Sequence, residues 1–159
     1  MTVTTENSAQ INNLAASPPV IENSHNLHGR LRVAYFSHTQ SEAGEVLSTV
    51  KIVKLPPGKI RLLGALSRIE HNWTESTVDM DIGWAAYVDL DGTAVSDNDD
   101  GLDADVDVEA TGSIAIGTVV TGATKVFESR DGVDIVLKAQ AAGLGINDTV
   151  EGYLVYVQD

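Results

Sequence analysis

The chain has 159 residues, of which 43% are hydrophobic, and its formal net charge is −13. This length and composition suit one domain with a single core. Because the chain has no cysteine, disulfides, thiolate zinc sites, cysteine nucleophiles and thiol redox chemistry are excluded. The sequence has no stretch of roughly 18 apolar residues, the length that a membrane-spanning helix needs. Its start lacks the basic residues and the apolar stretch of a secretion signal. We therefore expect no membrane partner.

The charge is distributed unevenly along the chain. Residues 1–70 carry seven Lys and Arg against five Asp and Glu, whereas residues 71–159 carry three against eighteen. A surface this acidic repels the phosphates of nucleic acids. We therefore expect no nucleic acid among the partners, and a protein surface or water beside the second half.

Residues 1–28 predict an extended N-terminal arm. They are rich in Thr, Ser and Asn, and Pro18-Pro19 favours an extended path. Two interpretations remain open: a disordered tail, or a segment that becomes ordered by lying across a neighbouring subunit. His25 and His28 lie three residues apart, but the sequence supplies no further metal ligands near them, and we predict no metal site.

Residues 29–69 have the patterns of β-strands. Their apolar positions are Leu31, Val33, Tyr35, Val46, Val50, Ile52, Ile60, Leu62, Leu63 and Leu66. Leu-Pro-Pro-Gly at 55–58 predicts a turn, because proline fixes φ and Gly58 tolerates a left-handed conformation. Residues 62–70 also have helix propensity, but we favour a strand.

Residues 78–90 show the clearest periodicity in the chain. Every even position is apolar: Val78, Met80, Ile82, Trp84, Ala86, Val88 and Leu90. Asp79, Asp81 and Asp89 fall on the odd positions, so the period is two. This pattern predicts one long strand, with Trp84 in the core and the aspartates on a solvated face.

Residues 89–109 contain nine carboxylates and no basic residue. We predict a solvated acidic loop, with a short helix at 102–109, because like charges at this density repel one another. A calcium loop is one alternative, although Ser96 and Asp107 depart from the EF-hand pattern at its first and twelfth positions. An acidic patch that meets a basic partner is the other.

The last third of the chain returns to strand patterns, at 113–120, 125–128, 133–139 and 149–158. One face of the 133–139 strand has Val133, Ile135, Leu137 and Ala139, and in the 149–158 strand Val150, Leu154 and Tyr156 alternate with Glu151, Tyr153 and Val155. Gly143 and Gly145 do not form a dinucleotide-binding loop, because the third glycine position is Asp148 and no βα unit surrounds it. Together these patterns predict an all-β fold. We expect residues 29–159 to form a β-sandwich, a jelly roll of about eight antiparallel strands.

The sequence contains no catalytic motif. Asp79 and Asp81 point the same way on the predicted strand, but on its solvent face their pKa values should not be raised enough for acid catalysis. We therefore expect no catalytic residues, no cofactor-binding residues and no cofactors, and conclude that the chain is not an enzyme.

Four segments occur in a characteristic order: Leu-Pro-Pro-Gly-Lys-Ile at 55–60, and residues 84–95, 100–108 and 152–157. Over about residues 45–159 the chain resembles small virion proteins from the structural operons of tailed bacteriophages. The resemblance implies a capsid-associated β-sandwich that acts as a decoration or cement protein on the head.

Several expectations follow from that resemblance. The partner is the major capsid protein, with self-association as a trimer or another symmetric oligomer. The protein is made in the host cytoplasm and resides on the capsid surface of the virion. Apart from the resemblance, the sequence has one basic cluster: Arg30, Arg32, Lys51, Lys54, Lys59 and Arg61. Two interpretations remain open: these residues face an acidic neighbour, either the capsid or the 89–109 segment of an adjacent copy, or they are ordinary outward strand residues. The alternative function is a calcium-dependent binding module, such as a head-fibre or carbohydrate-binding protein.

Overall fold

The computed structural model describes residues 16–18, 30–73, 77–117 and 124–158. The predicted arm, apart from residues 16–18, and the end of the predicted 113–120 strand lie outside these ranges. In chain order the elements are β1 (Leu31–Thr39), β2 (Thr49–Leu55), β3 (Gly58–Leu63), the 3₁₀ turn η1 (Gly64–Leu66), β4 (Arg68–Asn72), β5 (Asp79–Trp84), β6 (Tyr87–Val88), β7 (Ala94–Val95), β8 (Asn98–Asp107), β9 (Gly112–Ala115), β10 (Thr124–Ser129), β11 (Val133–Gln140) and β12 (Thr149–Gln158).

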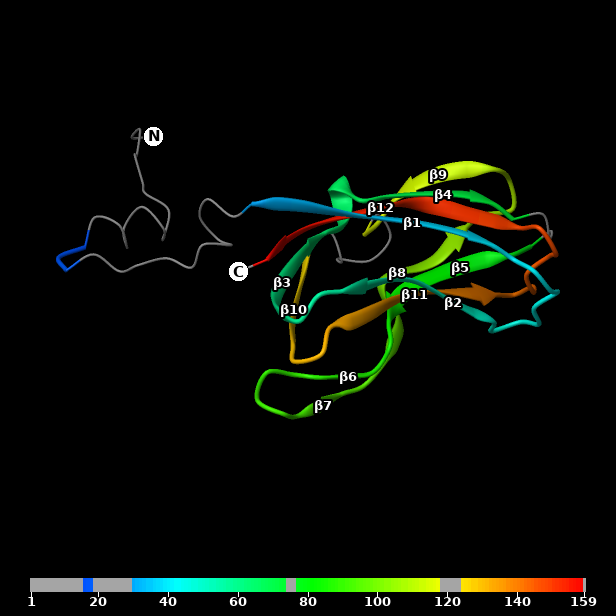
Figure 1. Cartoon of the computed structure of the whole chain (residues 1–159). Helices are drawn as coiled ribbons and strands as arrows, with labels where there is room; N and C mark the ends of the chain where they lie inside the picture. Colours follow the sequence, from blue (N-terminus) through cyan, green and yellow to red (C-terminus); the bar gives the residue numbers. More distant parts are fainter. Residues whose placement is uncertain (1–15, 19–29, 74–76, 118–123, 159) are drawn as a thin grey trace, which may run out of the picture.

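Two antiparallel sheets lie face to face (Figure 1). In the first sheet, β12 pairs with β1 on one side and with β3 and β4, one after the other, on its opposite side. β10 and β9 then pair with β3 and β4. The second sheet has the order β2, β11, β5, β8. When β3 with β4 and β9 with β10 are each counted as one interrupted strand, each sheet has four strands, as in a jelly roll. The predicted all-β sandwich is confirmed.

The core lies between the two sheets and is built from alternate residues of each strand. On β11, the predicted inward set of Val133, Ile135, Leu137 and Ala139 is fully buried. On β12, the predicted inward residues Val150, Leu154 and Tyr156 are buried as well. Both strands therefore follow the expected period of two.

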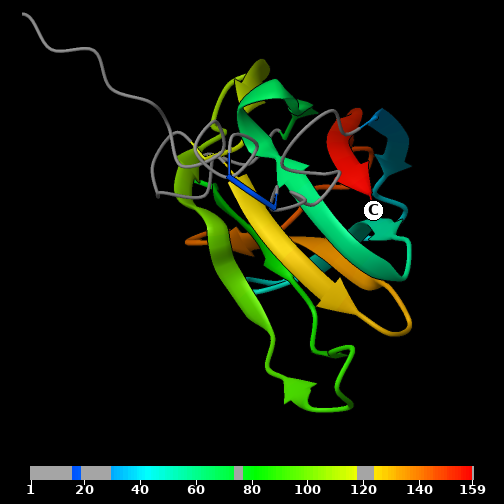
Figure 2. The same cartoon turned by 90° about the vertical axis from the view of Figure 1, so that its left-hand side faces the viewer.

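The predicted strand at 78–90 is divided in two. Val78, Met80, Ile82 and Trp84 are buried as expected, but β5 ends at Trp84. The backbone N–H of Ala85 donates to the carbonyl of Asp134, and the chain then leaves the sheet to form the β6–β7 hairpin. Figure 2 shows this hairpin projecting from the sandwich. The prediction of one continuous strand is wrong, because Tyr87 and Val88 pair with Val95 and Ala94 of the hairpin instead of with β11.

The predicted acidic loop with a helix at 102–109 is also wrong. Residues 98–107 form β8, which pairs with β5 at the edge of the second sheet. The register shifts twice along this pair, so the aspartates of β8 do not all fall on one face. Leu102 and Val106 enter the core, and this apolar burial supports a strand despite the local density of negative charge.

The turn at 55–58 connects β2 to β3 as predicted, with Gly58 at a φ of 109°. The strand predicted over 59–69 is interrupted by η1, which separates β3 from β4. Ser67 lies between η1 and β4. Its hydroxyl donates to the carbonyl of Leu63 over 3.0 Å and accepts the backbone N–H of Val155 over 2.9 Å. Ser67 thus completes the pairing of β12 at the point where β3 ends and β4 begins.

His71 on β4 is a buried histidine, with only 4% of the residue exposed. Burial lowers the pKa of His71 below the ordinary value of 6.5, although the Asp107 carboxylate acts in the opposite direction. The folded protein therefore holds the neutral imidazole more strongly than the unfolded chain does.

We expect His71 to make folding stability depend on pH. Below 6.5 the unfolded chain takes up the proton first, so the free energy of unfolding falls from pH 6.5 down to the lowered pKa. Urea unfolding of the wild type and His71→Gln at about pH 8 and about pH 5 measures this effect. The stability advantage of the wild type over the variant should shrink as the pH falls; an advantage that stays constant would contradict the prediction.

Candidate functional site

The outer face of the first sheet carries an apolar surface that no described segment covers fully. We call it the β1–β12 face; it consists of Leu31, Val33, Tyr35, Tyr153, Val155 and Val157. Leu31 lies opposite Val157, Val33 opposite Val155, and Tyr35 opposite Tyr153. The three β1 side chains are 61%, 48% and 79% exposed, whereas Val155 and Val157 are only 7% and 5% exposed, so the open part of this face lies on β1. The alternation seen in the sequence is present on β1, but its apolar residues point outward.

A depression of about 240 Å³ lies at one end of this face. Tyr35 and Tyr153 form part of its wall, with ring centroids 6.0 Å apart in an edge-to-face arrangement. Gly152 is among its lining residues and has a φ of 155°. A Cβ atom there would lie only 2.1 Å from the carbonyl oxygen of Arg68. The close approach of β12 and β4 therefore requires glycine at this position.

Charged side chains line the same depression. Glu70 and Glu151 occupy directly opposite positions on β4 and β12, and both are exposed. Like charges in opposite positions destabilise a sheet. Arg68 also lines the depression, but within the described residues no ion pair joins it to either glutamate. The site therefore combines two tyrosines, two carboxylates and one guanidinium.

The outer face of the second sheet is different, because aspartates predominate there. Asp79 on β5 lies opposite Asp107 on β8. Lys138 on β11 pairs with Asp99; their hydrogen bond lowers the pKa of Asp99 and raises that of Lys138. These contacts give the sandwich one apolar outer face and one acidic outer face.

Three carboxylates are buried and serve the structure. Asp81, predicted to be solvated, is 5% exposed and accepts hydrogen bonds from the Asp105 N–H and the Gln140 amide. Asp103 accepts the Gly117 N–H over 2.9 Å, and Asp148 accepts the Gly145 N–H over 2.6 Å. The prediction for Asp81 is wrong because β8 and β11 supply partners that the local sequence does not reveal.

The predicted basic cluster is divided between the two sheets. Lys51 and Lys54 lie on β2, whereas Lys59 and Arg61 lie on β3 of the other sheet. Lys51 pairs with Asp134 over 2.9 Å, and Lys59 pairs with Glu128. Two of these cations are thus engaged within the molecule.

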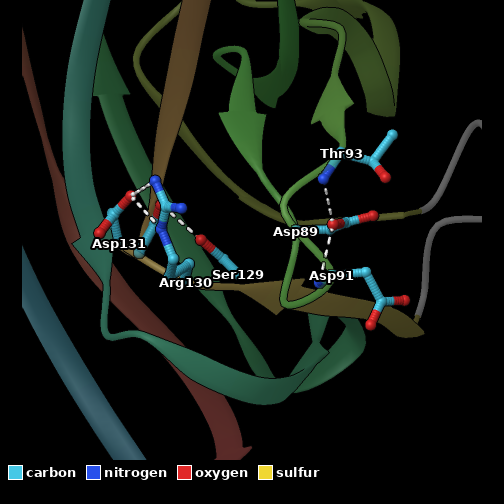
Figure 3. A network of polar contacts seen from close by, with 7 residues as sticks. Asp89, Asp91, Thr93, Ser129, Arg130 and Asp131 are labelled. Carbon is cyan, nitrogen blue, oxygen red and sulfur yellow. Dashed lines mark hydrogen bonds and ion pairs between the residues drawn. The ribbon is translucent and has the colours of Figure 1, made fainter.

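The β6–β7 hairpin is fixed by a side chain in its own turn. The Asp89 carboxylate accepts the backbone N–H groups of Thr93 over 2.7 Å and of Asp91 over 3.0 Å (Figure 3). At the base, the Arg130 N–H donates to the carbonyl of Val88, and the Tyr87 ring packs edge-to-face on Phe127. The turn predicted at 89–92 is present, and this aspartate preorganises it.

Within the described residues, no group of three or more His, Asp or Glu side chains is arranged to hold a metal ion. No helix in this part of the chain is long and apolar enough to cross a membrane.

Comparisons with known proteins give matches in structure. No protein-family model and no curated sequence matches the chain. A chain in the capsid of Ralstonia phage GP4 is similar with a TM-score of 0.64 and 17% identity, over 82% of this chain and 86% of that one. A chain in the capsid asymmetric unit of cyanophage Pam1 gives 0.60 and 16%, over 99% and 100%. These similarities establish the fold.

We expect removal of the Asp89 carboxylate to loosen the hairpin turn. Because a typical hydrogen bond contributes about 1 kcal/mol, the amides of Asp91 and Thr93 should exchange with solvent about fivefold faster in Asp89→Ala. Asp89→Asn, which keeps an acceptor oxygen, is the matched control and should retain slow exchange. Amide hydrogen exchange measures both variants; unchanged exchange in Asp89→Ala would contradict the assigned role.

Proposed function

We propose that this chain is a structural virion protein that binds the outside of a phage capsid and stabilises the head through contacts with the major capsid protein. The observation that carries the proposal is the whole-length similarity to a chain in the capsid asymmetric unit of cyanophage Pam1. The similarity to a chain in the capsid of Ralstonia phage GP4 supports the same role. A virion location belongs to the same proposal.

The geometry of the molecule agrees with an adhesive role. A sandwich with a continuous core is stiff, and one of its outer faces exposes three large apolar side chains of a single strand. Exposed apolar patches of this kind are typical of protein interaction surfaces. The acidic outer face of the second sheet suits contact with water, because its charges favour hydration.

The proposed role is not enzymatic. The buried carboxylates Asp81, Asp103 and Asp148 each accept a backbone N–H, so they stabilise the fold. Self-association as a trimer or another symmetric oligomer, and synthesis in a host cytoplasm, belong to the same proposal. Repeated copies on a symmetric shell would strengthen weak individual contacts through avidity.

Addition of the purified protein to capsids that lack it tests the proposal. The protein should sediment with the shells, appear on their outer surface by electron microscopy, and raise the temperature at which they rupture. This rise should increase with protein concentration and then saturate, because a ligand stabilises the state that it binds.

An unrelated acidic protein of similar size is the control and should leave the rupture temperature unchanged. Failure of the protein to bind the shells would overturn the capsid-binding role. Binding that saturates without any change in rupture temperature would overturn the stabilising role alone.

A further inference from the structure

We infer that the β1–β12 face is the surface that docks on the capsid, and that its depression receives a Lys or Arg side chain of the capsid protein. This inference rests on the proposed function and adds the contact surface and its chemistry. The partner is then an apolar protein surface with a basic side chain at its edge.

The apolar part of the argument concerns β1. Leu31, Val33 and Tyr35 project from one side of this strand, and each is about half exposed or more. β1 is also an edge strand, since within the described residues it pairs only with β12. An edge strand with exposed apolar side chains tends to associate with other protein chains unless a partner surface covers it.

The charge argument concerns the depression. Glu70 and Glu151 face each other there, while Arg68 provides a single positive charge on its wall. A second cation placed between the two carboxylates would relieve their repulsion. The Tyr35 and Tyr153 rings also line the depression, so they offer apolar contact to the methylene stem of an entering Lys or Arg side chain.

The same charges argue against a second copy as the main occupant. Each chain carries a net charge of −13, so two copies repel each other over most of their surfaces. A basic capsid side chain meets no such repulsion. The outer face of the second sheet and the β6–β7 hairpin fit less well, because the former is acidic and the latter exposes only one large apolar side chain, Leu90.

The inference predicts that Tyr35→Ser and Glu151→Lys each weaken the binding of this protein to shells that lack it, by at least about tenfold. Tyr35→Ser removes a large side chain from the centre of the interface, and Glu151→Lys reverses a charge in the depression. Leu90→Ser and Asp100→Lys are the matched controls. They remove an exposed apolar side chain and reverse an exposed charge away from this face, and should bind as the wild type does. Thermal melting verifies that all four variants are folded.

The outcomes are distinguishable. If the wild type fails to bind shells, the proposed function fails; if it binds and both face variants bind equally well, the inference fails while the function stands. Sedimentation of the protein without shells tests whether a second copy of the chain occupies the β1–β12 face instead. If the wild type self-associates and Tyr35→Ser abolishes this association, the face is an interface between copies, which overturns the capsid contact.

Discussion

The pairing of β12 along both of its edges is the constraint on which the rest of the structure depends. β1 pairs with it from Leu31 opposite Val157 to Thr39 opposite Thr149, so the first and last strands of the sandwich are neighbours. On the other edge, β3 and β4 share β12 between them, and Ser67 fills the gap. This register decides which residues of four strands point into the core.

The same register gives β12 two apolar faces. Leu154 and Tyr156 point into the core, whereas Val155 and Val157 lie on the outer face, opposite Val33 and Leu31 of β1. Val155 and Val157 are only 7% and 5% exposed, as is typical of a strand in a sheet covered on both sides. The outer apolar surface that remains open is therefore that of β1.

The strands that the sequence predicts best are those in which apolar and polar residues alternate regularly between clear turns. β11 and β12 are strands of this kind, and their inward residues are predicted correctly. The outward direction of Tyr35 was not predictable from β1 itself, because Ala34 and Phe36 offer an equally apolar inward set. Only pairing with β12, far along the chain, selects between the two faces.

The acidic segment was predicted poorly for a related reason. Its charge density favours a loop when neighbouring residues alone are considered, but Asp103 is buried against the Gly117 N–H and Asp99 pairs with Lys138 of another strand. These partners are distant in sequence. The depression beside Tyr153 was missed as well, since it depends on the contact between Gly152 and β4.

The opposite characters of the two outer faces have a consequence for many copies on one shell. With the apolar face docked, the acidic face of each copy points away from the shell, where water hydrates its carboxylates. At physiological ionic strength, charges more than about 8 Å apart are largely screened from each other. Neighbouring copies therefore repel one another weakly once bound, although each carries thirteen excess negative charges.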